Sequence, residues 1–239
     1  AQAPTQEARQ LAQQAQLQAD RNRAYYAKNR ELHRSVELRL TEQIRNCILV
    51  HQQPNARVAR SGALCAGRVW RAPVLGDDRV FRCAEEENQP SFTVDLLLDA
   101  SASRLHCQEV LAAQGSILAQ SLTNCGIPVR VSSFSSLRGY TVLRVLKDFA
   151  DKNLQHINGY FASGWNRDGL ALLAAGDLLD FAPGPAPRHL LILLTDAAPN
   201  DSRRIPPSPQ DPLGCGYQDA AGVADTAAQV RALQRKGIR

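Results

Sequence analysis

A chain of 239 residues with 44% hydrophobic content can bury a core for one domain of about 150 residues plus an extra segment, or for two small domains. No apolar run approaches the roughly 18 residues that a membrane span needs, which excludes a transmembrane helix. The net charge of +5, from 28 basic and 23 acidic residues, comes mainly from the part before Ser91, where interspersed acids favour a solvated surface over a nucleic-acid site.

The first segment, residues 1–55, is rich in Gln, Ala, Arg and Glu, which are helix formers. Apolar residues recur in it mostly at three- or four-residue steps, which predicts an amphipathic helix over residues 20–51. The Gln-rich start before it is either helical or frayed. The charges fit a solvated helix face, and a docking helix for a partner is the alternative.

Residues 56–90 are interrupted by Pro, Gly and Asn and are predicted to form a connecting segment. One short element is expected around residues 67–72, and a strand over residues 80–83. Gly62 and Gly67 form no phosphate loop, because no Gly-Lys-Ser/Thr follows them. The sequence therefore carries no nucleotide-binding motif.

A domain is predicted over residues 91–239, and its first strand is Phe-Thr-Val-Asp-Leu-Leu-Leu-Asp, ending at Asp99. A short apolar run between polar residues is typical of a strand buried on both faces of a parallel sheet. Ser101 and Ser103 follow at the strand end, and an apolar stripe predicts a helix over residues 104–123. Either serine could instead be only the N-cap of that helix.

The next strands are predicted over residues 127–134 and 140–146. Only residues 135–139 separate them, too few for a parallel crossover, so the pair should be an antiparallel hairpin. A helix over residues 170–181 and a buried strand over residues 188–196 follow.

The Pro- and Gly-rich residues 200–219 predict a surface loop beside the end of the last strand, with a disordered insertion as the alternative. Residues 229–239 fit a helix stopped by Gly237 and followed by the start of a strand. We therefore expect the chain to be cut as that strand begins. Because the chain has no methionine, even at position 1, we also expect it to lack its native start.

The six cysteines show no CxxC pair and no regular spacing, and the five histidines form no pair such as HExxH. The sequence shows no signal-peptide pattern. These features predict free thiols in a reducing, cytoplasmic setting and no zinc site.

Three acids fall at strand ends or helix starts: Asp99, Asp168 and Asp196. Buried strands with crossover helices place such ends at one edge of the sheet, where α/β proteins bind ligands. Carboxylates with the hydroxyls of Ser101 and Ser103 suit a hard, six-coordinate cation such as Mg²⁺ or Mn²⁺. We therefore predict that these five residues form a metal site.

Two motifs, Asp99-Ala-Ser-Ala-Ser103 and Leu194-Thr-Asp-Ala-Ala-Pro-Asn-Asp201, resemble the metal-ion-dependent adhesion site of von Willebrand factor A domains. Asn166-Arg-Asp-Gly169, with Ser61-Gly-Ala-Leu and Gly67-Arg-Val-Trp upstream, is similar to bacterial proteins of the nitric oxide reductase activation protein and cobaltochelatase T subunit group. The resemblance covers residues 61–239. It implies a Rossmann-like α/β fold, with a doubly wound, mostly parallel sheet and one antiparallel edge strand.

In that family the strand order is 3-2-1-4-5-6, so the strands ending at Asp99 and Asp196 would be neighbours. Asp99, Ser101 and Ser103 match the first metal loop of the family, and Asp196 matches the acid of the third. The second loop departs from the pattern. Many relatives have a threonine there, whereas this chain offers Asp168, which would bind the metal directly or through water.

The resemblance implies a non-catalytic adaptor that couples a MoxR-type AAA+ ATPase to a client enzyme, for activation or metal-cofactor insertion. The absence of a nucleotide motif is consistent with such a partner. The alternative is a magnesium-dependent phosphohydrolase with Asp99 as nucleophile, but that class needs a second acid two residues later, where this chain has Ser101. Nucleic-acid binding through the basic N-terminal helix is a third hypothesis.

Overall fold

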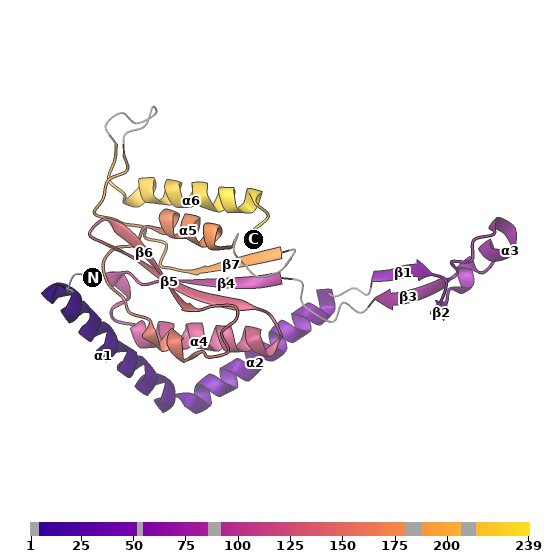
Figure 1. The fold of residues 1–239 in the computed structure, drawn as a ribbon, viewed down its shortest axis with the longest axis horizontal. Coiled ribbons are helices and arrows are strands. Elements are labelled where there is room, and N and C mark those ends of the chain that lie inside the picture. Colours follow the sequence, from indigo (N-terminus) through magenta and orange to yellow (C-terminus); the bar gives the residue numbers. More distant parts are fainter. Residues whose placement is uncertain (1–4, 52–54, 86–91, 180–187, 207–213) are drawn as a thin grey trace. The chain divides into compact units, whose positions relative to one another are not determined.

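The computed structural model describes residues 5–51, 55–85, 92–179, 188–206 and 214–239 (Figure 1). The chain packs into two compact units, one of residues 1–41 with 91–239 and the other of residues 42–90. The segment expected to be a connection, residues 56–90, thus makes up most of a unit of its own, and that unit begins inside a helix rather than at residue 56.

Two helices form the N-terminal segment, α1 over Gln6–Lys28 and α2 over Arg30–His51. The prediction of one helix over residues 20–51 is therefore wrong, although the Gln-rich start is helical. The break lies at Asn29, where φ is −104° and ψ is 20°. The Asn29 side-chain amide donates to the Tyr25 carbonyl at 3.0 Å. Asparagine favours such helix ends because its side chain competes for backbone hydrogen bonds.

The first unit is built on a mixed sheet with strand order β6-β5-β4-β7. Its strands are β4 (Phe92–Asp99), β5 (Val129–Leu137), β6 (Tyr140–Lys147) and β7 (Arg188–Leu194). β4 pairs in parallel with β5 and β7, and β5 and β6 form the predicted antiparallel hairpin. The strand that ends at Asp99 and the strand that leads to Asp196 are therefore neighbours, as expected.

Helices cover both faces of this sheet (Figure 1). α4 (Gln108–Asn124) lies on one face, and α5 (Asp168–Leu179) and α6 (Asp219–Arg235) lie on the other. The sequence thus correctly predicted an α/β domain with a helical N-terminal segment and a mixed sheet that contains parallel strands.

The core lies between the sheet and the helices. Leu97 and Phe134 of the sheet pack with Leu172 of α5 and Leu233 of α6 in one buried cluster. α6 approaches α5 closely at Gly176, where a Cβ would lie 2.5 Å from a methyl carbon of Leu233.

An ion pair is also buried in the sheet, away from the carboxyl end of β4. Asp95 of β4 and Arg130 of β5 are direct cross-strand neighbours. Arg130 donates to both carboxylate oxygens of Asp95, from Nε at 2.6 Å and from Nη2 at 3.2 Å. Its Nη1 donates to the carbonyl of Leu178 in α5 at 3.1 Å. Burial raises the pKa of Asp95, and Arg130 opposes this rise.

The helix α1 packs onto the rest of the first unit through buried polar side chains. Gln18 donates to Glu109 of α4 at 2.8 Å. The Asn22 amide donates to the carbonyls of Asn158 and Tyr160, at 2.8 and 2.9 Å. The Tyr160 hydroxyl in turn donates to the backbone carbonyl of Asp99.

The second unit is a small antiparallel sheet with strand order β1-β3-β2. Its elements are β1 (Asn55–Ala59), β2 (Ala63–Leu64), the 3₁₀ turn η1 (Ala66–Arg68), α3 (Arg71–Leu75) and β3 (Phe81–Glu85). The short element expected around residues 67–72 corresponds to η1 and the start of α3, and the strand expected over residues 80–83 corresponds to β3.

The predicted surface loop, residues 200–219, has a packed base. Asp201 and Tyr217 are both buried, and the Asp201 amide donates to the Tyr217 carbonyl at 2.9 Å. The base therefore belongs to the domain, and the Pro-rich residues 207–213 lie outside the described residues. At the end of the chain, Ile238 forms a parallel bridge with His189 of β7, where the start of a strand was expected.

None of the described helices combines the length and the apolar character that crossing a membrane requires. Cys47, Cys65, Cys107 and Cys215 are free thiols, as the sequence predicted, and the Cys83 side chain lies outside the described residues.

Candidate metal centre

The ends of β4 and β7 bring four of the predicted site residues together: Asp99, Ser101, Ser103 and Asp196. The register pairs Leu98 with Leu194, so Asp99 and the Thr195–Asp196 segment leave the sheet side by side. After β4 the chain makes a 3₁₀ turn, η2 (Ala102–Arg104), and α4 begins only at Gln108. The N-cap position of α4 is Cys107, so the helix-cap hypothesis for Ser101 and Ser103 is wrong for this helix.

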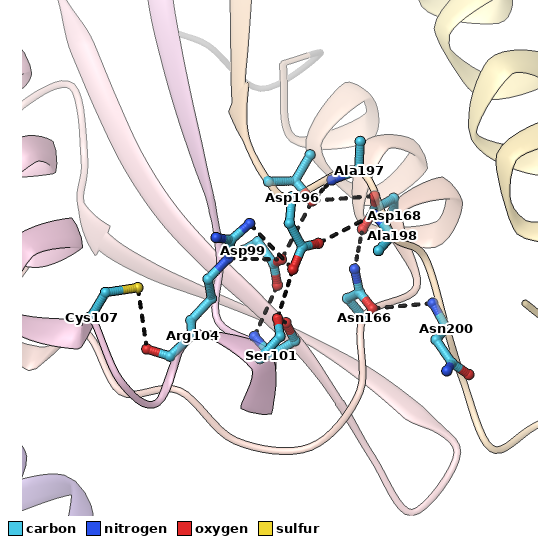
Figure 2. A network of polar contacts seen from close by, with 12 residues as sticks. Asp99, Ser101, Arg104, Cys107, Asn166, Asp168, Asp196, Ala197, Ala198 and Asn200 are labelled. Carbon is cyan, nitrogen blue, oxygen red and sulfur yellow. Dashed lines mark hydrogen bonds and ion pairs between the residues drawn. The ribbon is translucent and has the colours of Figure 1, made fainter. Parts of the chain in front are cut away.

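The two serine hydroxyls connect the first strand end to the second. The Oγ atoms of Ser101 and Ser103 are 2.9 Å apart. Ser103 Oγ donates to Asp196 Oδ2, also at 2.9 Å. Figure 2 shows Ser101, Asp99 and Asp196 in one polar network at this edge. The serines thus face the acids, as metal ligands would.

Asp99 and Asp196 each accept a backbone hydrogen bond with one carboxylate oxygen and direct the other oxygen toward the site. Asp99 Oδ1 accepts from the Ser101 amide at 2.9 Å, and Asp196 Oδ1 accepts from the Ala198 amide at 3.2 Å. The Oδ2 atoms face the site, where that of Asp196 accepts from Ser103 Oγ. The Asp99 side chain is 0% exposed and that of Asp196 is 29% exposed, so the site opens on the Asp196 side.

Asp168 joins this group from the start of α5 through Thr195, a residue that the sequence analysis missed. Thr195 Oγ1 lies 3.3 Å from Asp99 Oδ2 and 3.5 Å from Asp168 Oδ2. A hydroxyl has one hydrogen, so it can donate to only one of these carboxylates at a time. Asn166 donates to Asp168 Oδ1 at 3.3 Å. A hydroxyl residue directly before an acid at a strand end was the available signal for Thr195.

The acids are crowded enough to change their proton affinities. Burial raises the pKa of Asp168 to about 6, and the charges of Asp99 and Asp196 contribute to the rise. Burial also raises the pKa of Asp99, while hydrogen bonds from Ser101 lower it. Buried carboxylates that repel one another are stabilised by a cation placed between them.

Arg104 supplies one such cation, and the sequence analysis missed this residue as well. Its Nε lies 3.6 Å from Asp99 Oδ2, and its Nη2 lies 3.4 Å from Asp196 Oδ2. Figure 2 shows the guanidinium reaching toward the carboxylates of Asp99 and Asp196. The sequence analysis placed Arg104 at the first residue of a predicted helix and assigned it no role.

The donor set fits a hard divalent cation. The described residues include no group of three or more His, Cys, Asp or Glu side chains that could hold a metal. Asp168 therefore does not complete a three-acid cluster with Asp99 and Asp196, and a cation between those two acids would take further oxygens from the hydroxyls of Ser101 and Ser103. A set composed only of oxygens suits Mg²⁺ or Mn²⁺, which tolerate several water ligands.

No protein-family model matches this chain, and no curated protein matches it either.

Proposed function

We propose that this chain is a metal-dependent protein-binding adaptor of the von Willebrand factor A type. In this proposal Asp99, Ser101, Ser103 and Asp196 hold Mg²⁺ or Mn²⁺, with Asp168 contributing directly or through water. The chain serves a MoxR-type AAA+ ATPase and a client enzyme in activation or metal-cofactor insertion. It has no turnover of its own and acts in the cytoplasm.

The observation that carries the proposal is the hydroxyl bridge between two strand ends. Ser101, Ser103 and Asp196 are linked by two contacts of 2.9 Å, although the serines and the acid are more than ninety residues apart in sequence. A helix cap would need only one of these serines and no distant acid. Hydroxyl and carboxylate oxygens gathered at the carboxyl edge of parallel strands fit cation binding better.

In this proposal the residues of the site have different roles. A bound cation would supply an open coordination position for a carboxylate of a partner protein. Asp99, which is fully buried, fixes the inner side of the site, and Asp196 lies on the exposed side where a partner has access. Ser101 and Ser103 orient both acids, and the turn η2 holds the serines in place.

The phosphohydrolase alternative has less support. A nucleophilic carboxylate must reach its substrate, whereas the Asp99 side chain is 0% exposed and one of its oxygens accepts from the Ser101 amide. Ser101 also stands where that class requires a second acid.

Calorimetry with Mg²⁺ and Mn²⁺ tests the proposal. Wild-type protein should bind one cation, Asp99→Ala should lose binding, and Ser103→Ala should weaken it because a direct ligand is removed. Ser35→Ala, on an exposed face of α2, is the matched control and should bind like wild type. In a second arm, the site variants should abolish stimulation of the partner ATPase while circular dichroism shows an intact fold.

Equal affinity in wild type and Asp99→Ala would refute the metal assignment. Metal-dependent phosphatase activity that disappears in Asp99→Asn would refute the adaptor and support the enzyme.

A further inference from the structure

We infer that Arg104 is a tethered cation that neutralises the metal-free site and must leave it before a divalent cation can bind. This inference rests on the proposed metal site. It makes Arg104 a residue that sets cation affinity, although it is not itself a metal ligand.

The position of Arg104 between the two acids is the first argument. Its guanidinium contacts the Oδ2 atoms of Asp99 and Asp196, the same oxygens that turn away from the backbone toward the site. A divalent cation held by these oxygens would lie beside a positive guanidinium. Like charges that share the same carboxylate oxygens repel strongly where water is scarce. The guanidinium of Arg104 and a divalent cation therefore exclude each other.

The guanidinium of Arg104 makes only long contacts with the two carboxylates. The N···O distances of 3.6 and 3.4 Å are longer than those of a charge-assisted hydrogen bond, which are about 2.7 to 2.9 Å. Arg104 Nε is buried and has no hydrogen-bond partner among the described residues. Charge attraction, with little directional bonding, therefore holds the guanidinium.

The same domain contains an arginine that is built differently. Arg130 donates to both oxygens of Asp95, at 2.6 and 3.2 Å, and also to the Leu178 carbonyl. That arrangement is typical of a permanent structural pair. Arg104 lacks these bonds, so its guanidinium can be displaced while Arg130 stays in place.

Only the side chain of Arg104 has to move. Its amide donates to the Ser101 carbonyl at 3.0 Å, and its own carbonyl accepts from the Cys107 amide at 3.0 Å, so the backbone is fixed within and after η2. The side chain is 19% exposed, which gives the guanidinium a route to solvent. Rotation of the side chain would clear the site without disturbing Ser101 or Ser103.

Cation binding to Arg104→Gln is the decisive test. Glutamine keeps much of the side-chain length and removes the charge. We expect Mg²⁺ and Mn²⁺ to bind the variant about tenfold more tightly than wild type, because a partly buried ion pair no longer competes. Arg203→Gln removes the same charge from an exposed side chain that donates to the Gly139 carbonyl, and it should leave the affinity unchanged.

Thermal unfolding in a chelator tests the neutralising role without metal. There Arg104→Gln should lower Tm relative to wild type and to Arg203→Gln, because Asp99 and Asp196 lose their counter-ion, and added Mg²⁺ should restore Tm. Equal or weaker cation affinity in Arg104→Gln would refute the exchange, and an unchanged Tm in chelator would refute the neutralisation. Failure of both proteins to bind either cation would refute the proposed metal site, and the exchange with it.

Discussion

Asp168 begins α5 with its carboxyl buried beside Thr195, and its pKa is raised to about 6. In an unfolded chain an aspartate titrates near 4. At a pH between these two pKa values, Asp168 is protonated in the folded protein and ionised in the unfolded chain. The stability contributed by this group is therefore fully present below about pH 4 and is lost as the pH rises through about 6.

Replacement of Asp168 by Asn should reveal this effect. In chelator at pH 7, Asp168→Asn should be more stable than wild type by up to about 3 kcal/mol, since each pKa unit corresponds to about 1.4 kcal/mol. The difference should shrink toward zero at pH 4. Urea denaturation at pH 4, 5, 6 and 7 measures it, and a variant that is less stable than wild type at pH 7 would contradict the burial argument.

At this scale the sequence placed acids and serines correctly at strand ends, because that placement follows from the order of strands and helices. It did not identify Thr195, for which a hydroxyl before an acid at a strand end was a signal, and it could not show the contact of Arg104 with the acids. The contact of Arg104 depends on η2, which turns the chain before α4 starts at Gln108. Cys107 occupies the N-cap position, and cysteine is not among the residues that signal a helix start.

Among the elements, β4 and β5 are joined by the buried pair of Asp95 and Arg130. Removing one member of a buried pair leaves an uncompensated charge. Arg130→Met should therefore destabilise the protein by about 3 to 5 kcal/mol. The double variant Asp95→Leu/Arg130→Met should recover most of the loss, because no isolated charge remains.

Urea denaturation of the single and double variants gives the coupling energy of this pair. Single variants that cost less than about 1 kcal/mol would mean that the pair contributes no more than a surface ion pair does. Sequence could not have predicted the pairing, because it depends on the register that sets Asp95 opposite Arg130. Sequence also could not have predicted that Gln18 and Asn22 of α1 make buried contacts. In a Gln-rich helix these two residues cannot be distinguished from solvent-exposed ones.

For the whole molecule, the two units differ in how much apolar surface they bury. Among the side chains described in residues 42–90, Val80 is the buried apolar one, whereas β4 alone buries Val94, Leu96, Leu97 and Leu98. Trp70 and Val74, on either side of the start of α3, are exposed. A small sheet with so little buried apolar surface among its described side chains is marginally stable.

Hydrogen exchange should therefore separate the two sheets. Amides in β1, β2 and β3 should exchange far faster than those in β4 and β5, because local opening costs less where few apolar contacts form. Mass spectrometry of peptides from each sheet measures this difference. Equal protection would show that another surface covers the second unit. The sequence could not reveal a folded unit in residues 42–90, since its breakers are also those of a linker.

The docking of α1 has a thermodynamic consequence for the proposed cation site. The Asn22 amide donates to the Tyr160 carbonyl, and the Tyr160 hydroxyl donates to the carbonyl of Asp99. Two hydrogen bonds therefore join the N-terminal helix to the backbone of a site residue. Free energies that link two binding events are reciprocal. If releasing α1 changes the cation affinity by some factor, binding the cation must change the docking equilibrium of α1 by the same factor. A partner that binds α1 would then have an affinity that depends on whether the site holds a cation.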